Sequence, residues 1–367
     1  MGKKGNQSQK PMAEIKDFLK NLLSLPGLSG YEDPVRSVIR EAWQPLVDEL
    51  SVSRIGSLHG LKKGFGDEPR PRILLSAHMD AIGMIVTGIE AGLLRFTEIG
   101  GVDARILPGQ PVTVHGRREL PGYVVQPPGW LLPEDQATNK AVEMKYLFVD
   151  TGLRAAEVNE LVRVGDLVSF AQPPIELTGD LLAGHSLDNR ASVAAVTACL
   201  QELQHIRHIW DVWAVASVQE EETLGGAYTS SFAIRPDLAV AIDVTFARGP
   251  GSPANYSTFP LGKGVTLGWG PNIHPALYEA FKKLAEKLDM PYHDDLMPRM
   301  SGTDAMGIQV VAEGIPTMVL SMPIRYMHTP VEVVSMKDIA RTGHLMAQFI
   351  AELPVDYMQM LRWDDES

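Results

Sequence analysis

Two apolar runs, VWAVASV at residues 212–218 and LAVAIDV at residues 238–244, decide the fold class of this sequence. Runs this apolar, without an alternating polar face, are typical of strands that helices cover on both sides. Shorter runs at residues 73–75 and 317–322 have the same character, and residues 191–203 between them carry a helical pattern. The alternation of strand and helix predicts an α/β fold with a mixed sheet flanked by helices.

Further helices are predicted at both ends of the chain. Near the start, an amphipathic helix is indicated by apolar residues at i, i+3, i+4, i+7 and i+8: Ile15, Phe18, Leu19, Leu22 and Leu23. A second helix is expected to begin with Asp33 as its N-cap and Pro34 in its first turn. A last long helix is expected to begin at Ser335, with Asp338 completing a pair that resembles a capping box.

The sequence changes character between residues 84 and 172. Short β-like pieces alternate there with turns rich in glycine, proline and charge, and Pro121-Gly122 reads as a breaker. We therefore expect a small β-rich domain at 84–172 inserted into a larger domain made of residues 12–83 and 173–367. Residues 1–11 are expected to form a flexible tail.

Composition excludes several classes of protein. The 367 residues contain 33 Lys and Arg against 45 Asp and Glu, so the net charge of −12 argues against nucleic acid as a partner. The single cysteine, Cys199, leaves no internal disulfide and no zinc module built on cysteine. Neither a signal-peptide core nor an apolar run long enough for a membrane span is present, so we expect a cytoplasmic protein without a membrane partner.

Five polar clusters fall just after a predicted strand or at the entrance of a helix. They lie at residues 78–80, 187–190 and 220–222, and at Asp243 and His328. The carboxyl ends of strands in an open α/β sheet converge on one crevice, so we expect these clusters to meet. Histidines and carboxylates without thiols suit zinc, cobalt or manganese.

Charge favours two ions over one. Asp188, Glu221 and Asp243 together with two neutral imidazoles carry −3, so a single divalent ion leaves −1 in a buried pocket. Two ions leave +1, which one hydroxide neutralises, and one carboxylate can bridge a pair of ions that lie about 3.5–4 Å apart. The consecutive Glu220 and Glu221 point in different directions, so that one can bind metal while the other accepts a proton from water.

Taken singly, each signal has an ordinary alternative. The acidic run at residues 220–222 is by default a solvated turn, and His-x-Asp is more often a capped loop. His205 and His208 are expected on the surface, near the polar end of a helix. His185, which lies just before the 187–190 cluster, is a further candidate for lining the site. The joint placement of the clusters at strand ends is what favours a metal site.

The order of seven strings resembles the tetrahedral (TET) or glutamyl aminopeptidase family of metallopeptidases, also called deblocking aminopeptidases and sometimes labelled cellulase M or endoglucanase. The strings are LLSAHMD (74–80), LDNR (187–190), VQEE (218–221), AIDVT (241–245), GPNIHP (270–275), GTDA (302–305) and RYMHTPVEVV (325–334). The resemblance extends from about residue 12 to residue 353 and is specific when the strings are taken together.

This resemblance implies a role for each site residue. Five metal ligands are implied: His78 and Asp243 on one ion, His328 and Glu221 on the other, and Asp188 bridging the two. Glu220 would be the general base, and Asp80 would orient the ligand imidazole. The implied cofactors are two divalent ions, with zinc or cobalt preferred over manganese.

The resemblance also implies an assembly and a substrate. The family fold is a phosphorylase/hydrolase-like metallopeptidase domain with an inserted dimerisation domain, and its dimers assemble into hollow dodecamers that act on short peptides. Three positions depart from the family pattern: Ala81 replaces a glutamate, His185 a lysine and Glu222 a valine. The preferred N-terminal residue is therefore not inherited from the family.

Three alternatives to the aminopeptidase stay open. A related di-zinc amidohydrolase or deacylase has a similar order of ligands. An endoglucanase needs two carboxylates on either side of a glycosidic bond, but leaves His78 and His328 unexplained. A scaffold with an inactive site would retain the shell of the enzyme, and the changes at Ala81 and after Glu221 are its only support.

Overall fold

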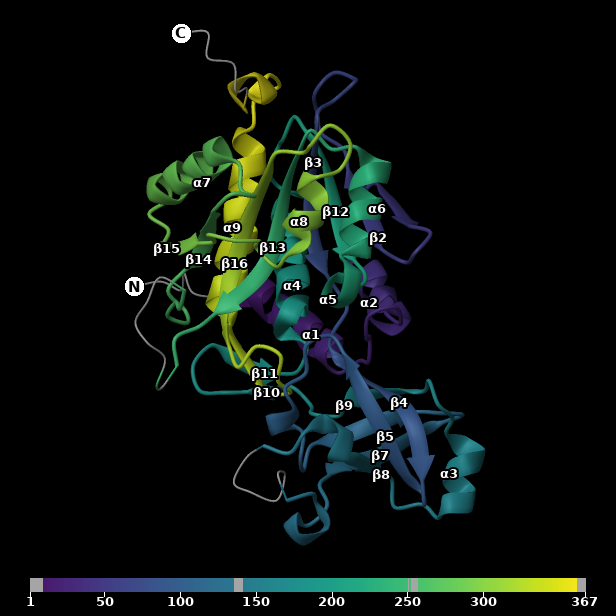
Figure 1. Cartoon of the computed structure of the whole chain (residues 1–367). Coiled ribbons are helices and arrows are strands. Elements are labelled where there is room, and N and C mark those ends of the chain that lie inside the picture. The colour runs from purple at the N-terminus through teal and green to yellow at the C-terminus, as the bar shows by residue number, and fades with distance from the viewer. Residues whose placement is uncertain (1–8, 135–140, 250, 252–256, 362–367) are drawn as a thin grey trace.

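The computed structural model describes residues 9–134, 141–249, 251 and 257–361. Figure 1 shows a large sheet with helices on both faces and, below it, a smaller β structure. Helix α1 (Gln9–Leu23) begins inside the segment 1–11 that the sequence predicts as a tail. Residues 1–8 of that tail lie outside the described residues.

The large sheet has eleven strands within the described residues. They are β1 (Glu49–Val52), β2 (Leu58–Lys62), β3 (Arg72–His78), β10 (Ile175–Glu176), β11 (Leu181–Gly184), β12 (Asp211–Ser217), β13 (Leu238–Phe246), β14 (Val265–Trp269), β15 (Tyr292–Leu296), β16 (Thr317–Arg325) and β17 (Glu332–Ser335). Their order is β1, β2, β12, β3, β13, β16, β17, β11 and β10, with β14 beside β16 and β15 beside β14. Parallel and antiparallel pairs both occur, so the sheet is mixed, as predicted.

The four central strands, β12, β3, β13 and β16, are parallel to one another. All four apolar runs read from the sequence lie in them, and most of their residues are buried because helices cover both faces. Strand β11 points the same way as β16, since each is antiparallel to β17 between them. These five strands therefore present their carboxyl ends at the same edge of the sheet.

The helices lie on both faces of this sheet. They are α2 (Asp33–Trp43), α4 (Leu187–Glu202), α6 (Gly225–Ile234), α7 (Pro275–Lys287), α8 (Asp304–Gln309) and α9 (Met336–Glu352). In Figure 1, α6 and α8 lie in front of the sheet, and α4 lies behind it. Helices α4 and α9 pack closely at Gly343, where an added Cβ would lie 2.8 Å from the carbonyl oxygen of Ala195. None of the described helices is long and apolar enough to cross a membrane.

The smaller structure is a closed barrel of six strands in the order β4, β5, β8, β7, β6 and β9. The strands are β4 (Gly83–Glu90), β5 (Leu93–Ile99), β6 (Pro111–His115), β7 (Glu119–Val125), β8 (Phe148–Asp150) and β9 (Leu167–Phe170), with helix α3 (Ala155–Leu161) before β9. It has an apolar core of its own, separate from that of the large sheet. The region that the sequence predicts as β-rich thus contains a complete barrel.

Two strands of the barrel, β5 and β7, are not predicted from the sequence. Pro121 and Gly122 were expected to break the chain, but they lie inside β7 and pair with β6. A Cβ on Gly122 would lie 3.0 Å from Cγ1 of Val149 on the neighbouring strand β8. Glycine thus allows the close approach of two strands at this position, and it marks no turn.

Two of the predicted helix starts differ in detail. Helix α9 has Ser335 as its N-cap, as expected, and the Ser335 hydroxyl accepts from the backbone N–H of Lys337. The Asp338 carboxylate does not complete a capping box, because it accepts from the backbone N–H groups of Gly262 (2.6 Å) and Gly264 (3.0 Å). Helix α2 begins at Asp33, which places Glu32 at the N-cap.

Candidate metal centre

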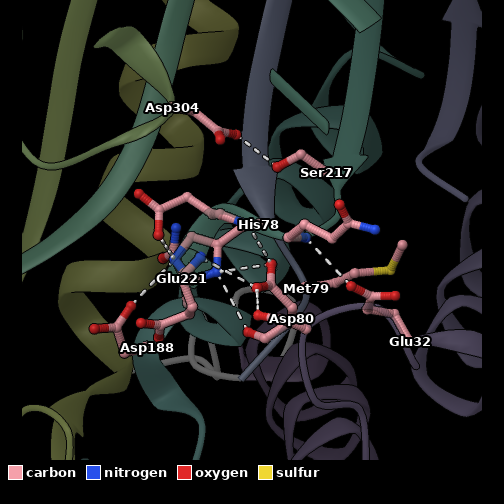
Figure 2. Close-up of polar contacts among 12 residues, drawn as sticks. Glu32, His78, Met79, Asp80, Asp188, Ser217, Glu221 and Asp304 are labelled. Carbon is pink, nitrogen blue, oxygen red and sulfur yellow. Dashed lines mark hydrogen bonds and ion pairs between the residues drawn. The ribbon is translucent and has the colours of Figure 1, made fainter. Parts of the chain in front are cut away.

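The carboxyl edge of the large sheet brings together all five residues that the sequence predicts as metal ligands. They come from five elements: His78 at the end of β3, Asp188 at the start of α4, Glu221 in the short helix α5 (Glu220–Thr223), Asp243 in β13, and His328 shortly after β16. Figure 2 shows His78, Glu221 and Asp188 close together below these strand ends. The convergence follows from the common direction of the five strands.

Asp188 lies between the two histidines. Its Oδ1 is 3.2 Å from Nε2 of His78, and its Oδ2 is 3.4 Å from Nε2 of His328. On the two sides, Oδ1 of Asp243 is 4.0 Å from Nε2 of His78, and Oε2 of Glu221 is 3.6 Å from Nε2 of His328. The two oxygens of Asp188 therefore face different histidines, which is the geometry that a bridging carboxylate requires.

Glu220 lies as near to His78 as the predicted ligands do. Its Oε2 is 3.7 Å from Nε2 of His78. Two sets of three potential ligand atoms lie within 4.8 Å of one another: His78, Glu220 and Asp243, and His78, Asp188 and Glu221. Distance alone does not separate a base from a ligand here, so the role of Glu220 stays a prediction.

Backbone carbonyls fix the orientation of both imidazoles. Nδ1 of His78 lies 3.3 Å from the carbonyl oxygen of Asp80, and Nδ1 of His328 lies 2.9 Å from that of Gly101. A proton on each Nδ1 leaves each Nε2 free to bind a cation, an arrangement typical of histidine ligands. Gly101 lies in the loop between β5 and β6, so a loop of the barrel takes part in the centre.

The carboxylate of Asp80 holds the turn that carries the two glutamates. It accepts from the backbone N–H groups of Glu220 (3.1 Å) and Glu221 (3.2 Å) and from the hydroxyl of Ser29 (2.5 Å). One of its oxygens also lies 3.5 Å from Nδ1 of His78. Asp80 thus contacts both a predicted ligand and the backbone of the predicted base.

A second buried carboxylate, Glu32, supports the same turn and was missed from the sequence. It accepts from the backbone N–H groups of Gly30 (2.7 Å) and Gln219 (3.2 Å). Gln219 has a left-handed backbone with φ of 59°, which redirects the chain between β12 and α5. Burial raises the pKa of Glu32 to about 7. The sequence carries no signal for this contact, because Glu32 lies in a loop far from VQEE along the chain.

Two more buried carboxylates were missed, although both lie in strings quoted above. Glu332 accepts from the backbone N–H groups of Asp188 (3.1 Å) and His328 (2.9 Å), and it therefore holds two predicted ligands. Asp304 accepts from the hydroxyls of Ser76 and Ser217, each at 2.6 Å, and joins the ends of β3 and β12 to α8. Their positions within RYMHTPVEVV and GTDA were the available signal.

Burial shifts three carboxylates of the centre, Glu220, Glu221 and Asp243, toward their protonated form. It raises the pKa of Glu220 and of Glu221 to about 8, against the opposing charge of His78. Burial also raises the pKa of Asp243 well above its ordinary value. These shifts arise because several carboxylates share a pocket with little water, a situation that cations relieve.

The histidines respond in the opposite direction. The hydrogen bond with Asp188 raises the pKa of His328 to about 9. Burial opposes protonation of His78, but the carboxylates of Glu220 and Asp188 outweigh it and raise the pKa of His78 well above its ordinary value. In the absence of cations, protons on the two imidazoles therefore offset part of the carboxylate charge.

The other histidines considered from the sequence lie away from the centre. His185 is buried with its Nδ1 2.6 Å from the hydroxyl of Ser186, and it does not line the pocket at the strand ends. His205 is exposed, as expected. His208 is buried, with its Nδ1 2.8 Å from the carbonyl oxygen of Trp210, so the prediction of a surface position is wrong.

The donor set suits divalent cations. All the candidate atoms are imidazole nitrogens and carboxylate oxygens, which bind zinc, cobalt and manganese. Oε1 of Glu221 is buried and has no hydrogen-bond partner among the described residues, so one ligand atom is left for a cation. The centre also opens into a pocket of about 310 Å³, which gives a small substrate access.

An α/β sheet with candidate metal ligands at its carboxyl edge is typical of metal-dependent hydrolases. The comparison with known families identifies the branch: residues 56–345 match the M42 glutamyl aminopeptidase family, and the chain belongs to it. The resemblance read from the sequence strings is thereby confirmed.

Several known proteins are similar to this chain over nearly its whole length. A lysyl aminopeptidase from Pyrococcus furiosus is 34% identical over 93% of this chain and 98% of its own length. The crystal structure of a TET aminopeptidase from a marine sediment thaumarchaeon superposes with a TM-score of 0.89 at 29% identity, covering 95% of this chain and 99% of that one. The TET1 peptidase of Pyrococcus horikoshii, described as assembling into a tetrahedron or a large octahedral shell, gives a TM-score of 0.80 at 29% identity over 92% of this chain and all of its own.

Proposed function

We propose that this chain is a dinuclear metalloaminopeptidase that hydrolyses N-terminal residues from short peptides. Membership of the M42 family makes it a peptide hydrolase that depends on metal. The observation that carries the dinuclear proposal is the position of Asp188, whose two oxygens face two different histidines. His78 and Asp243 would hold one ion and His328 and Glu221 the other, with zinc or cobalt preferred over manganese.

When bound, two divalent ions polarise the scissile carbonyl and lower the pKa of a water molecule toward neutrality. Glu220, whose Oε2 lies 3.7 Å from Nε2 of His78, would accept the proton of that water and donate it to the leaving amine. Asp80 keeps Glu220 in place through the backbone N–H of this residue.

The barrel gives a physical basis for assembly. We propose that the inserted domain, residues 84–172, mediates dimerisation, while residues 12–83 and 173–367 form the catalytic domain. Three large apolar side chains of the inserted region are exposed, Tyr123 (59%), Trp130 (81%) and Leu131 (61%), and a partner subunit would cover them. The shell described for the Pyrococcus horikoshii peptidase supports a homo-oligomer, with a dodecamer as the expected state.

The two alternative enzyme classes account for fewer features of the candidate metal centre than an aminopeptidase does. A di-zinc amidohydrolase would use the same ligands, and assaying an N-blocked peptide beside its free-amine counterpart separates the two activities. An endoglucanase would not need His78 and His328 beside Asp188. Cellulose hydrolysis that survives treatment with a chelator would be required to favour it.

The substitution Glu220→Gln tests the proposed base. It removes the proton acceptor but keeps the size of the side chain, so we expect metal content to be unchanged and kcat to fall by at least about 10²-fold. Glu41→Gln, an exposed glutamate of α2, is the matched control. Normal hydrolysis of aminoacyl nitroanilides by the Glu220→Gln variant would show that another group accepts the proton.

A further inference from the structure

The pocket at the strand ends has two chemically different walls. One wall consists of predicted metal ligands and the predicted base: His78, Asp188, Glu220, Glu221, Asp243 and His328. The other wall consists of Leu224, Val244, Gly302, Met306 and Met327. Every ionisable side chain among the described lining residues belongs to the first wall, so the second wall is wholly apolar. We call this second set of five residues the apolar wall.

Two bound divalent ions would compensate the carboxylates of the first wall. The four carboxylates Asp188, Glu220, Glu221 and Asp243 sum to −4, and two divalent cations sum to +4. A basic side chain entering the pocket would therefore meet no uncompensated carboxylate, and an acidic one would meet no free cationic side chain of the wall. Either would give up water without gaining a partner, which is unfavourable for a charged group.

The apolar wall can adapt its shape to a substrate. Methionine side chains are unbranched and polarisable and fill irregular gaps, so two of them give a surface that accepts apolar groups of different shape. Met306 is held at one end, because its sulfur accepts from the backbone N–H of Gly302 at 3.1 Å. Val244 directly follows the predicted ligand Asp243 in β13, so the apolar wall begins beside the metal centre.

From these observations we infer that the apolar wall binds the first side chain of the peptide and selects uncharged apolar residues such as leucine and methionine. The inference rests on the proposed function, since it assigns a substrate class to the same site. It sets this chain apart from the Pyrococcus furiosus relative, whose name specifies lysine. The pocket volume of about 310 Å³ is small for a ligand site and suits a single residue at a time.

A panel of four aminoacyl nitroanilides tests this inference on the metal-loaded full-length protein. We expect kcat/KM for the leucyl and methionyl substrates to exceed that for the lysyl and glutamyl substrates by at least about 10-fold. A lysyl or glutamyl substrate that matches or exceeds leucyl overturns the inference and leaves the proposed function intact. Failure to hydrolyse all four, with metal bound, overturns the proposed function and the inference with it.

Binding without turnover gives a second readout. Calorimetry on the metal-loaded Glu220→Gln variant is expected to show at least about 10-fold tighter binding of leucinamide than of lysinamide. Equal binding of the two amides, or tighter binding of lysinamide, contradicts a selective apolar wall.

A single substitution should move the preference. Met306→Glu places a carboxylate on the apolar wall, so we expect the ratio of lysyl to leucyl kcat/KM to rise by at least about 10-fold. Met300→Glu is the matched control, because Met300 is 78% exposed and does not line the pocket. An unchanged ratio in a folded Met306→Glu variant, or an equal change in both variants, overturns the assignment of the wall.

Discussion

The carboxyl edge of the large sheet and the interior of the barrel bury opposite kinds of side chain. At the sheet edge, His78, Asp188 and Asp243 are all less than a tenth exposed. In the barrel, the buried core consists of apolar residues such as Leu94 and Val149, which have no exposed surface. Buried charge opposes folding unless it is paired, whereas buried apolar surface favours it. The carboxyl edge of the sheet therefore holds charged groups that a cation can compensate, whereas the apolar interior of the barrel stabilises the fold.

Asp188→Ala gives the largest effect, because it removes the carboxylate that faces both histidines. We expect the variant to lose both ions and all measurable activity, because the carboxylate that would serve both ions is gone. Elemental analysis and turnover measure the two quantities. Asp17→Ala, in an exposed position on α1, should change neither of them. Two retained ions in the Asp188→Ala variant would show that Asp188 does not bridge.

Leu94→Ala tests the other side of the comparison. Leu94 is fully buried in the barrel and pairs with Val149, so its truncation leaves a cavity. We expect the free energy of unfolding to fall by about 2–5 kcal/mol, with kcat of the folded enzyme unchanged. Denaturant unfolding checks the first quantity, and Val164→Ala, 62% exposed in the same inserted region, is the control. Loss of metal in a folded Leu94→Ala variant would contradict the claim that the core of the barrel stabilises the fold without affecting metal binding.

A buried histidine outside the centre sharpens the contrast. Without a carboxylate partner, burial lowers the pKa of an imidazole, whereas the pKa values of His78 and His328 are raised. Burial lowers the pKa of His59 from 6.5 to about 4, and its Nε2 lies 2.9 Å from the hydroxyl of Ser230. As the pH falls from 6.5 toward 4, the unfolded chain binds a proton that the folded chain does not, and stability is lost.

The substitution His59→Gln removes this linkage. Between pH 7 and pH 5, the free energy of unfolding of the variant should fall by about 2 kcal/mol less than that of the wild type. Chemical denaturation at the two pH values measures the difference, and His205→Gln, at an exposed histidine, should follow the wild type. Parallel losses in wild type and His59→Gln would mean that His59 does not titrate in this range.

Glu222→Ala is expected to have the smallest effect, and it probes where the two regions meet. Glu222 departs from the family pattern, and its carboxylate accepts from the backbone N–H of Gly100 at 2.6 Å. Next to it, the carbonyl of Gly101 orients His328. Loss of one exposed hydrogen bond corresponds to about 1 kcal/mol, so we expect about a fivefold fall in kcat/KM. Glu98→Ala, at an exposed position on β5, is the control. An unchanged rate for Glu222→Ala would show that the hydrogen bond between Gly100 and Glu222 does not contribute to catalysis.

Much of the large sheet could be predicted because its signal is local. The four central strands are apolar runs, and their common direction explains why His78, Glu221 and Asp243 meet. In the barrel, the same approach missed β7, since the proline and glycine within it read as breakers. Glycine serves a close contact with β8 there, which depends on a neighbour that the sequence does not reveal.

The supporting carboxylates were harder to predict than the ligands. Glu32, Asp304 and Glu332 act through backbone N–H groups and serine hydroxyls of distant segments, so their types and spacing follow no local rule. The burial of His208 was missed for the same reason, because its position next to Trp210 is set by packing. The sequence indicates which groups can bind a cation, whereas the packed structure determines which groups orient them.

Anomalous diffraction from crystals loaded with cobalt or zinc is the most direct test of the dinuclear centre. We predict two peaks about 3.5–4 Å apart with Asp188 between them, His78 and Asp243 bound to one, and His328 and Glu221 bound to the other. A single peak, or two peaks bound by other residues, would contradict the assignment.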